Sequence, residues 1–162
     1  MDSAIRNYTS PIGNLLISSE GENITAVTFR DIIPEERSST AIDKCIIELD
    51  EYFSGAVTEF KLALTQPGTP FQQKVWASLE QIPYGATVSY HALSKRLGNV
   101  KAIRAVGTAN GKNNIAIIIP CHRVIGSNGS LVGYAGELWR KKWLLEHEAK
   151  FAHGVQTLFS TA

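Results

Sequence analysis

Cysteine is scarce in this chain of 162 residues, which contains only Cys45 and Cys121. Two cysteines are too few for a disulfide scaffold or a cysteine-built zinc site, so we expect a reducing, cytoplasmic compartment. The sequence also lacks a long apolar run, and its first ten residues lack the pattern of a secretory signal. We therefore expect neither a membrane-spanning nor a secreted protein. The hydrophobic fraction of 44% excludes a disordered chain.

The formal net charge of +1 conceals an uneven distribution of charge along the chain. Residues 1–66 carry 5 basic and 11 acidic side chains, whereas residues 67–162 carry 11 basic and 4 acidic ones. A basic second half indicates an anionic partner. The alternative is that surface charge varies along the sequence without functional meaning.

Proline and glycine punctuate residues 65–70, where the charge changes sign, so we place a domain boundary there. The first domain, residues 1–66, is predicted to be a small sheet with strands near 14–18, 24–29 and 59–64. A helix capped by Ser38 or Ser39 packs on this sheet and ends at Gly55. Its apolar stripe consists of Ile42, Cys45, Ile46, Leu49 and Phe53. Nothing in this domain indicates chemistry.

The second domain, residues 67–162, is predicted to be mostly helical. Three short helices follow the capping residues Thr69, Ser89 and Asn99. The second and third of them, over 90–97 and about 100–109, have the pattern of a helix-turn-helix. A buried strand is expected over 115–119, and a last helix over 138–149.

The third of these helices carries unusually small side chains. Ala102, Ala105 and Gly107 would let its backbone approach a surface closely, while Lys101 and Arg104 project from it. This composition favours DNA binding. The alternative is that the small residues pack against another helix.

Cys121 is the candidate nucleophile, because it directly follows Pro120 at the end of the expected strand and has His122 beside it. Adjacent residues of a regular strand point to opposite faces, so the backbone must bend at Pro120 or a water must bridge the two side chains. A histidine that acts as a base is usually oriented by a third group. Glu148, on the expected polar side of the last helix, is the first candidate, and Glu146 is the second.

Two other interpretations of these residues stay open at this point. Cys121 could be an ordinary core cysteine with His122 as a structural histidine. A zinc site would use Cys121, His122, His147 and His153, although their spacing matches no ligand pattern. Of the remaining candidates, Cys45 is expected to be a core residue, and His91, His147 and His153 are expected to be surface or packing residues.

The run Ile119-Pro120-Cys121-His122-Arg123-Val124 resembles the 6-O-alkylguanine-DNA alkyltransferases. Further matching blocks occur in the same order along the chain. They are Ser89-Tyr90, Arg104-Ala105-Val106-Gly107, Asn113 and Gly133-Tyr134-Ala135-Gly136. The resemblance implies an α+β fold, with an N-terminal ribonuclease-H-like sheet-and-helix lobe and a C-terminal helical lobe bearing a winged helix-turn-helix.

The resemblance also implies a function. The family repairs 6-O-alkylguanine by moving the alkyl group irreversibly onto a cysteine, without a cofactor, and we expect 4-O-alkylthymine as a second substrate. Cys121 matches that acceptor, His122 matches the histidine that removes its proton through a water, and Glu148 matches the carboxylate that orients this histidine. Asn113 matches the asparagine that holds the turn, and Tyr90 the tyrosine that polarises the purine. Val124, Tyr134 and the backbone at Ala135 would line the base pocket.

The same resemblance implies a double-stranded DNA partner, bound in the minor groove with the damaged nucleotide flipped out. Arg104 matches the arginine that fills the gap in the duplex, on the helix that carries Ala102, Ala105 and Gly107. Other basic residues placed to meet phosphates are Lys95, Arg96, Lys101 and Lys112. No metal is expected, and we expect a monomer.

The sequence departs from the family pattern at three positions. Glu137 stands where a second glycine is more common, and Asn114 and Ala116 stand where some members have proline. These changes bear on the tolerance for bulky adducts. Two competing functions remain, a non-catalytic binder of alkylated DNA and a cysteine hydrolase that would turn over.

Overall fold

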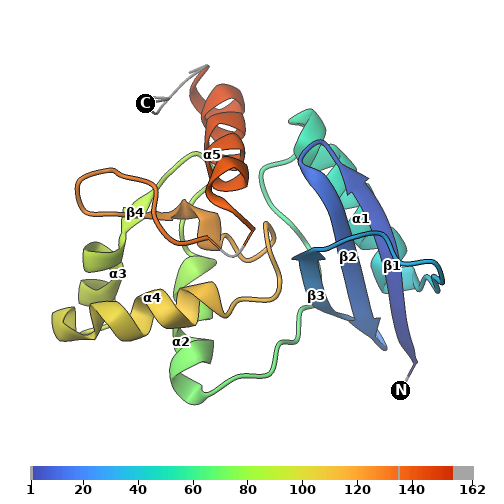
Figure 1. Cartoon of the computed structure of the whole chain (residues 1–162), viewed down its shortest axis with the longest axis horizontal. Helices are drawn as coiled ribbons and strands as arrows, with labels where there is room; N and C mark the ends of the chain where they lie inside the picture. Colours follow the sequence, from blue (N-terminus) through green and yellow to red (C-terminus); the bar gives the residue numbers. More distant parts are fainter. Residues whose placement is uncertain (1, 135, 155–162) are drawn as a thin grey trace. The chain divides into compact units, whose positions relative to one another are not determined.

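The computed structural model describes residues 2–134 and 136–154. Within them the chain forms two compact units. The first contains the residues up to Pro67 together with the segment Asn114–Ile118, and the second contains Gly68–Asn113 and the chain from Ile119 onwards. The predicted α+β class is confirmed, because the first unit is built around a sheet and the second is largely helical (Figure 1).

The sheet of the first unit is an antiparallel meander of β1 (Ser3–Ser10), β2 (Gly13–Glu20) and β3 (Asn23–Phe29). Gly13 and Gly21 have positive φ angles of 117° and 57° in the two tight turns, a conformation that glycine adopts without strain. Leu15 and Ile17 alternate along β2 and are fully buried. Their face of the sheet forms the core with the helix that follows.

That helix, α1 (Thr40–Ser54), begins and ends where the sequence predicts. The Ser39 side chain accepts the Ile42 N–H at its start, and Gly55 ends it in the left-handed conformation. Its buried residues are Ile42, Cys45, Leu49 and Tyr52, so Cys45 is a core residue as expected. Ile46 and Phe53, two members of the predicted stripe, are only half-buried.

Two predicted strands are wrong. In the segment 59–64, only Leu64 pairs, in an isolated bridge with Ile24. In the segment 115–119, only Ile115 pairs, with Val27, and the chain then turns. Both segments are apolar enough to be buried, but a short buried run has no periodicity that separates a strand from a turn.

The second unit begins with α2 (Pro70–Leu79), whose predicted cap is confirmed: Thr69 and Gln72 form a reciprocal capping box. The indole N–H of Trp76 donates to the carbonyl of Ala109 at 2.9 Å and ties α2 to α4 (Ile103–Gly111). The other helical elements are α3 (Tyr90–Arg96), the 3-10 turns η1 (Val100–Ala102) and η2 (Cys121–Arg123), and α5 (Leu138–His153).

Two short strands complete the second unit. β4 (Val88–Ser89) pairs in parallel with β5 (Val124–Ile125), so the residues before α3 lie beside the residues after η2. None of the helices in the described part of the chain is long and apolar enough to cross a membrane.

Candidate active site

The backbone bends at Pro120, which places Cys121 and His122 in the 3-10 turn η2 rather than on opposite faces of a strand. The Arg123 N–H donates to the Pro120 carbonyl at 3.0 Å and closes the turn. Cys121 is 6% exposed and is a free thiol. Access to its sulfur is therefore restricted.

Asn113 holds this turn from the end of α4. Its side-chain amide donates to the Ile119 carbonyl at 3.0 Å and to the Cys121 Sγ at 3.3 Å. Burial raises the pKa of the Cys121 thiol, and the Asn113 amide and the Lys141 charge oppose this shift. The net shift is upward, so the resting sulfur is a thiol that needs a base.

His122 is fully buried, and its Nε2 lies 2.7 Å from the Oε2 of Glu148. A carboxylate accepts hydrogen bonds, so this contact places the imidazole proton on Nε2 and leaves Nδ1 as the proton acceptor. Nδ1 is shielded from solvent and has no hydrogen-bond partner within the residues that the structure describes. Burial lowers the pKa of His122 against the opposing effect of Glu148, so the ring is neutral and able to take a proton.

Glu148 is fully buried on α5, so its predicted place on the polar side of that helix is wrong. Its neighbours Leu144 and Leu145 are buried too, and Glu148 follows them at helical spacing. Glu146, the second candidate, instead pairs with Lys142 at 3.7 Å along the helix.

Arg123 explains how a carboxylate can be buried there, and the sequence analysis did not single it out. Its Nε and Nη2 donate to the two carboxylate oxygens of Glu148 at 2.7 and 3.0 Å, and its Nη1 donates to the Ile82 carbonyl at 2.7 Å. Burial alone raises the pKa of the Glu148 carboxyl, but His122 and Arg123 outweigh this and hold it well below its usual range. Since Arg123 neutralises Glu148, His122 can stay uncharged.

Tyr90 begins α3, directly after the capping residue Ser89. Its hydroxyl donates to the carbonyl oxygens of Val132 and Gly133 at 3.4 and 3.3 Å. Burial raises its pKa. Gly107 lies against the ring, where a Cβ at Gly107 would be 3.9 Å from Cε1. The helix with the small residues therefore lies directly beside the side chain that would polarise the purine.

Lys141 is a second buried charge that the sequence analysis missed. Its Nζ donates to the Val132 carbonyl at 2.7 Å and lies 5.8 Å from the centre of the Tyr90 ring. Burial lowers its pKa to about 8, and the electrostatic interaction with Cys121 opposes this shift. Lys141 is seven residues before Glu148 on α5, so both belong to the buried stripe of that helix.

The structure describes two of the three residues expected to line a base pocket. Val124 is fully buried in β5. Tyr134 is half-buried with its hydroxyl oxygen shielded from solvent, and burial raises its pKa well above the usual value. Ala135 lies outside the described residues.

The zinc alternative finds no support in the part of the chain that the structure describes. No group of three or more His, Cys, Asp or Glu side chains there is placed to hold a metal ion. The His147 ring stacks on Trp143 at 4.9 Å, and His153 bonds to the Gly85 carbonyl at 3.0 Å. His147 therefore packs against an aromatic ring and His153 is an exposed residue, in line with the expected packing or surface roles.

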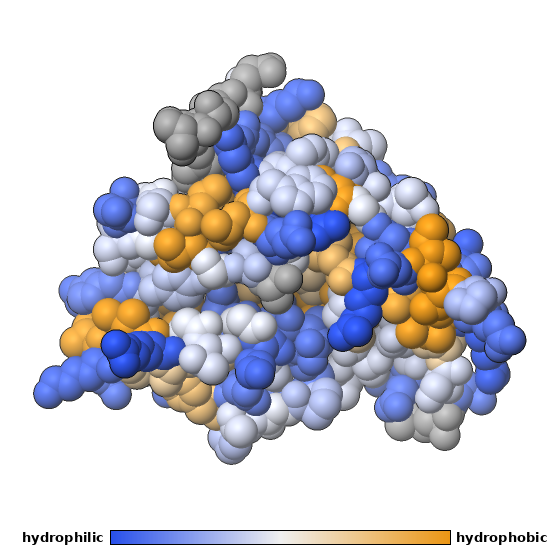
Figure 2. Space-filling view, in the orientation of Figure 1, coloured by the Kyte–Doolittle hydropathy of each residue, from blue (hydrophilic) through white to orange (hydrophobic). Residues whose placement is uncertain are grey.

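Exposed cations lie on α4, at its C-terminal cap and on the two elements before it in the second unit. They are Lys95, Arg96, Lys101, Arg104 and Lys112. Ala105 is exposed and Ala102 and Gly107 are half-buried, so the small residues are accessible. Val100 and Ile103, 44% and 38% exposed, add apolar surface at the start of the helix. Figure 2 shows hydrophobic surface beside strongly hydrophilic surface over this end of α4.

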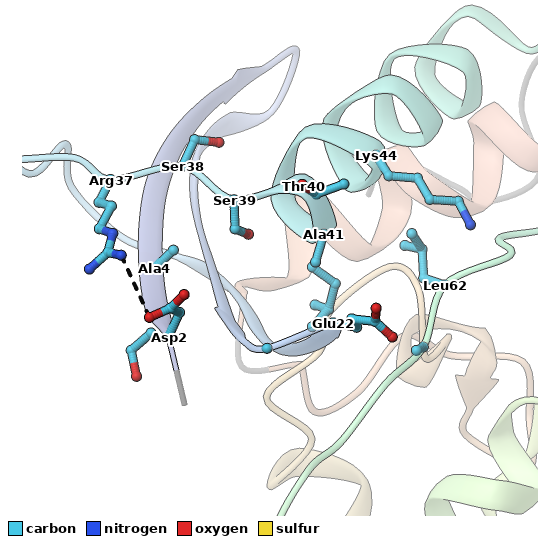
Figure 3. A pocket seen from close by; sticks show the side chains of 14 residues that line it. Asp2, Ala4, Glu22, Arg37, Ser38, Ser39, Thr40, Ala41, Lys44 and Leu62 are labelled. Carbon is cyan, nitrogen blue, oxygen red and sulfur yellow. Dashed lines mark ion pairs between the residues drawn. The ribbon is translucent and has the colours of Figure 1, made fainter.

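The first unit contains a pocket of about 660 Å³ between its N-terminal strand and the start of α1 (Figure 3). Several of its polar side chains already have partners. Arg37 pairs with Asp2 at 3.9 Å, the Ser39 hydroxyl bonds to Ser19 at 2.7 Å, and the Lys44 Nζ donates to a backbone carbonyl at 2.7 Å.

A buried thiol beside a neutral histidine, next to a basic helix pair, is a site for nucleophilic chemistry on an anionic partner. Two family models match the chain: the DNA binding domain of 6-O-methylguanine DNA methyltransferase over residues 70–150, and its ribonuclease-like domain over residues 5–66. The resemblance read from the sequence is confirmed, and the chain belongs to the 6-O-methylguanine DNA methyltransferase family.

Individual relatives agree with this assignment. A methylated-DNA–protein-cysteine methyltransferase of Mycobacterium leprae is 44% identical over 160 residues, which cover 95% of this chain and 97% of that protein. The crystal structure of Mycobacterium tuberculosis O6-methylguanine methyltransferase has a TM-score of 0.84 at 42% identity, covering 92% of this chain and 94% of that one. A structure of the M. tuberculosis protein in complex with DNA has a TM-score of 0.82 at 43% identity and covers 91% and 93%.

The three departures from the family pattern have visible consequences. The N–H of Asn114 donates to Gln66, and the N–H of Ala116 donates to the Val27 carbonyl at 2.9 Å, bonds that a proline could not make. Glu137 has a φ of 77° and a ψ of 147°, a backbone conformation that residues other than glycine rarely adopt.

Proposed function

We propose that this protein repairs double-stranded DNA by removing the alkyl group from 6-O-alkylguanine, and from 4-O-alkylthymine, and binding it to Cys121. The Cys121 sulfur attacks the alkyl carbon as the bond from that carbon to the base oxygen breaks. The thiol proton passes through a water to His122, and the departing base takes a proton from Tyr90. His122 gains the proton that the thiol loses, the base gains the proton that Tyr90 loses, and no group is oxidised or reduced. The proposed reaction therefore needs no cofactor.

The observation that carries this proposal is that the Cys121 thiol is followed in the same turn by a neutral, buried His122 whose Nδ1 has no hydrogen-bond partner in the described residues and can accept a proton. Asn113 supports the sulfur, and Glu148 fixes the tautomer of the imidazole. The thioether that forms has no leaving group that water displaces readily. Each molecule would therefore repair one lesion.

We assign DNA binding to the surface of α4. In this reading α3, η1 and α4, with the short β4–β5 pair, form a winged helix-turn-helix that docks in the minor groove. Arg104 enters the stack where the damaged nucleotide has flipped out, and the exposed lysines meet phosphates. The exposed Ala105 supports this role, because a small side chain allows close approach of the helix backbone to the groove floor.

The first unit, in this proposal, is a ribonuclease-H-like support, and the base pocket is lined by Val124, Tyr134 and the backbone at Ala135. The protein would act as a monomer in the cytoplasm, where a reducing environment keeps Cys121 a free thiol.

Intact-protein mass spectrometry tests the proposal after incubation with a duplex that contains 6-O-methylguanine. We expect a gain of one methyl group per molecule, located on Cys121 by peptide mapping and absent from Cys121→Ser. Lesion binding without mass gain would instead indicate a non-catalytic binder. Release of product beyond one equivalent would indicate a hydrolase.

A further inference from the structure

Asn110 is a buried polar residue of α4 to which the sequence analysis assigns no role. It is 2% exposed and contacts both Tyr90 and the turn that carries Cys121, the two residues that each give up a proton in the proposed reaction. Its side-chain nitrogen is 3.4 Å from the Tyr90 hydroxyl and 3.4 Å from the Cys121 carbonyl. It therefore connects α4 to both α3 and the nucleophile turn.

The Cys121 carbonyl determines which way the Asn110 amide points. A carbonyl oxygen can only accept a hydrogen bond, so the atom that faces it must be the Asn110 nitrogen. The second hydrogen of that nitrogen is then available to the Tyr90 oxygen. Tyr90 thus accepts from Asn110 and points its own proton at another acceptor, which in this structure is the carbonyl of Val132 or Gly133.

This orientation leaves the Asn110 Oδ1 shielded from solvent without a hydrogen-bond partner in residues 2–134 and 136–154. An unpaired buried oxygen is unfavourable, and an apolar side chain at this position would avoid it. The presence of asparagine at this position indicates that the hydrogen bonds of its side-chain nitrogen offset the cost of burying its oxygen.

We infer that Asn110 is a positioning residue that donates a hydrogen bond to the Tyr90 oxygen and stabilises the phenolate that forms as Tyr90 protonates the departing base. This inference rests on the proposed function. As the charge on Tyr90 grows, the bond becomes charge-assisted and shortens, as catalytic hydrogen bonds do on reaching the transition state.

Two other ionisable groups face Tyr90. The Lys141 Nζ lies 5.8 Å from its ring centre, and the Cys121 thiol acts on it through space. The positive charge of Lys141 favours a phenolate by simple attraction, whereas burial and the interaction with Cys121 oppose it. Asn110 is the side-chain donor that contacts the oxygen itself, and its hydrogen bond lowers the pKa of Tyr90 against the effect of burial.

The test is a double-mutant cycle on the rate of methyl transfer from a duplex with 6-O-methylguanine. Asn110→Ala and Asn110→Asp should each slow transfer by roughly 10-fold when Tyr90 is present, because each removes one donor to a developing charge. In the Tyr90→Phe background the same changes should alter the rate by less than about two-fold, since no phenolate forms there. A structural role for Asn110 would give equal losses in both backgrounds and would overturn the inference.

A second measurement does not depend on transfer. In protein labelled with carbon-13 at the tyrosine ζ position, the Tyr90 resonance should titrate at higher pH in Asn110→Ala and in the isosteric Asn110→Asp than in the parent. An unchanged Tyr90 titration would overturn the inference even if the rates fell. Absence of methyl transfer by the parent protein would reject the proposed function, while the titration would still decide the role of Asn110.

Discussion

Replacing Glu148 by glutamine removes the negative charge from a cluster of buried polar groups while keeping the size of the side chain. The carboxylate is fully buried and accepts hydrogen bonds from His122 at 2.7 Å and from Arg123 at 2.7 and 3.0 Å. Glutamine has only one acceptor oxygen, and its amide nitrogen would face either Arg123 or His122 as a second donor. Where the nitrogen faces Arg123, that guanidinium, 6% exposed, would keep its charge with a weakened set of acceptors that includes the Ile82 carbonyl.

The expected loss of folding stability comes from the uncompensated charge of Arg123 rather than from the number of hydrogen bonds lost. Removing one partner of a buried ion pair destabilises a protein by about 3–5 kcal/mol. That is a large part of the roughly 5–15 kcal/mol that holds a domain together, so Glu148→Gln should stay folded but be much less stable. Adding Arg123→Met removes the stranded charge. The double variant should therefore be more stable than the sum of the two single losses predicts, by about 1–3 kcal/mol.

Urea unfolding followed by circular dichroism at pH 8 measures all four corners of this cycle. Unchanged slopes against urea concentration would show that the variants share one folded and one unfolded state. A loss below about 1 kcal/mol for Glu148→Gln, or strict additivity in the double variant, would refute the argument that Arg123 depends on Glu148.

Three further predictions concern pH, backbone strain and DNA. Burial lowers the pKa of His122, so as the pH falls the unfolded chain takes up this proton before the folded chain does. The stability of the fold should therefore decrease as the pH drops below about 6.5. His122→Gln should lose this dependence between about pH 6.5 and 5, as measured by urea unfolding at each pH. Glu137→Gly should be more stable than Glu137→Ala by about 1 kcal/mol, because both lose the same side-chain contacts and only glycine relieves the φ of 77°. Equal stability of those two variants would contradict the strain argument. Arg104→Ala should slow repair of a duplex far more than reaction with the free modified base, and equal losses in the two assays would exclude a role in filling the duplex.

Local signals made the helix boundaries predictable. Ser39, Thr69 and Ser89 accept backbone N–H groups at the predicted helix starts, because a cap depends on a few neighbouring residues. The run 115–119 was mistaken for a strand since apolar residues are buried equally well in a turn, and Ile117 even has a φ of 70°.

The supporting charges of the site were not predictable in the same way. Hydrophobic periodicity assigns lysine, arginine and asparagine to the surface, yet Lys141, Arg123 and Asn110 are all buried. Their burial depends on partners outside their own helix or turn: Val132 for Lys141, Glu148 for Arg123, and Tyr90 for Asn110. For Lys141 and Glu148 a weak signal existed, because they lie on one stripe of α5 with Leu144 and Leu145.

The segment Asn114–Ile118 belongs to the first unit although both of its neighbours in the chain belong to the second. Its Asn114 carbonyl accepts the Val27 N–H of β3, and its Ala116 N–H donates to the Val27 carbonyl. Cys121 comes three residues after the end of this segment. No single cut in the chain can therefore separate the two units. A fragment that begins at Gly68 would carry Ile115 without the strand with which it pairs, and a fragment that ends at Pro67 would leave Val27 of β3 without that partner. Work on either unit alone, whether truncation, domain exchange or splitting the protein for a reporter, has to take this short segment with the first unit or replace what it covers.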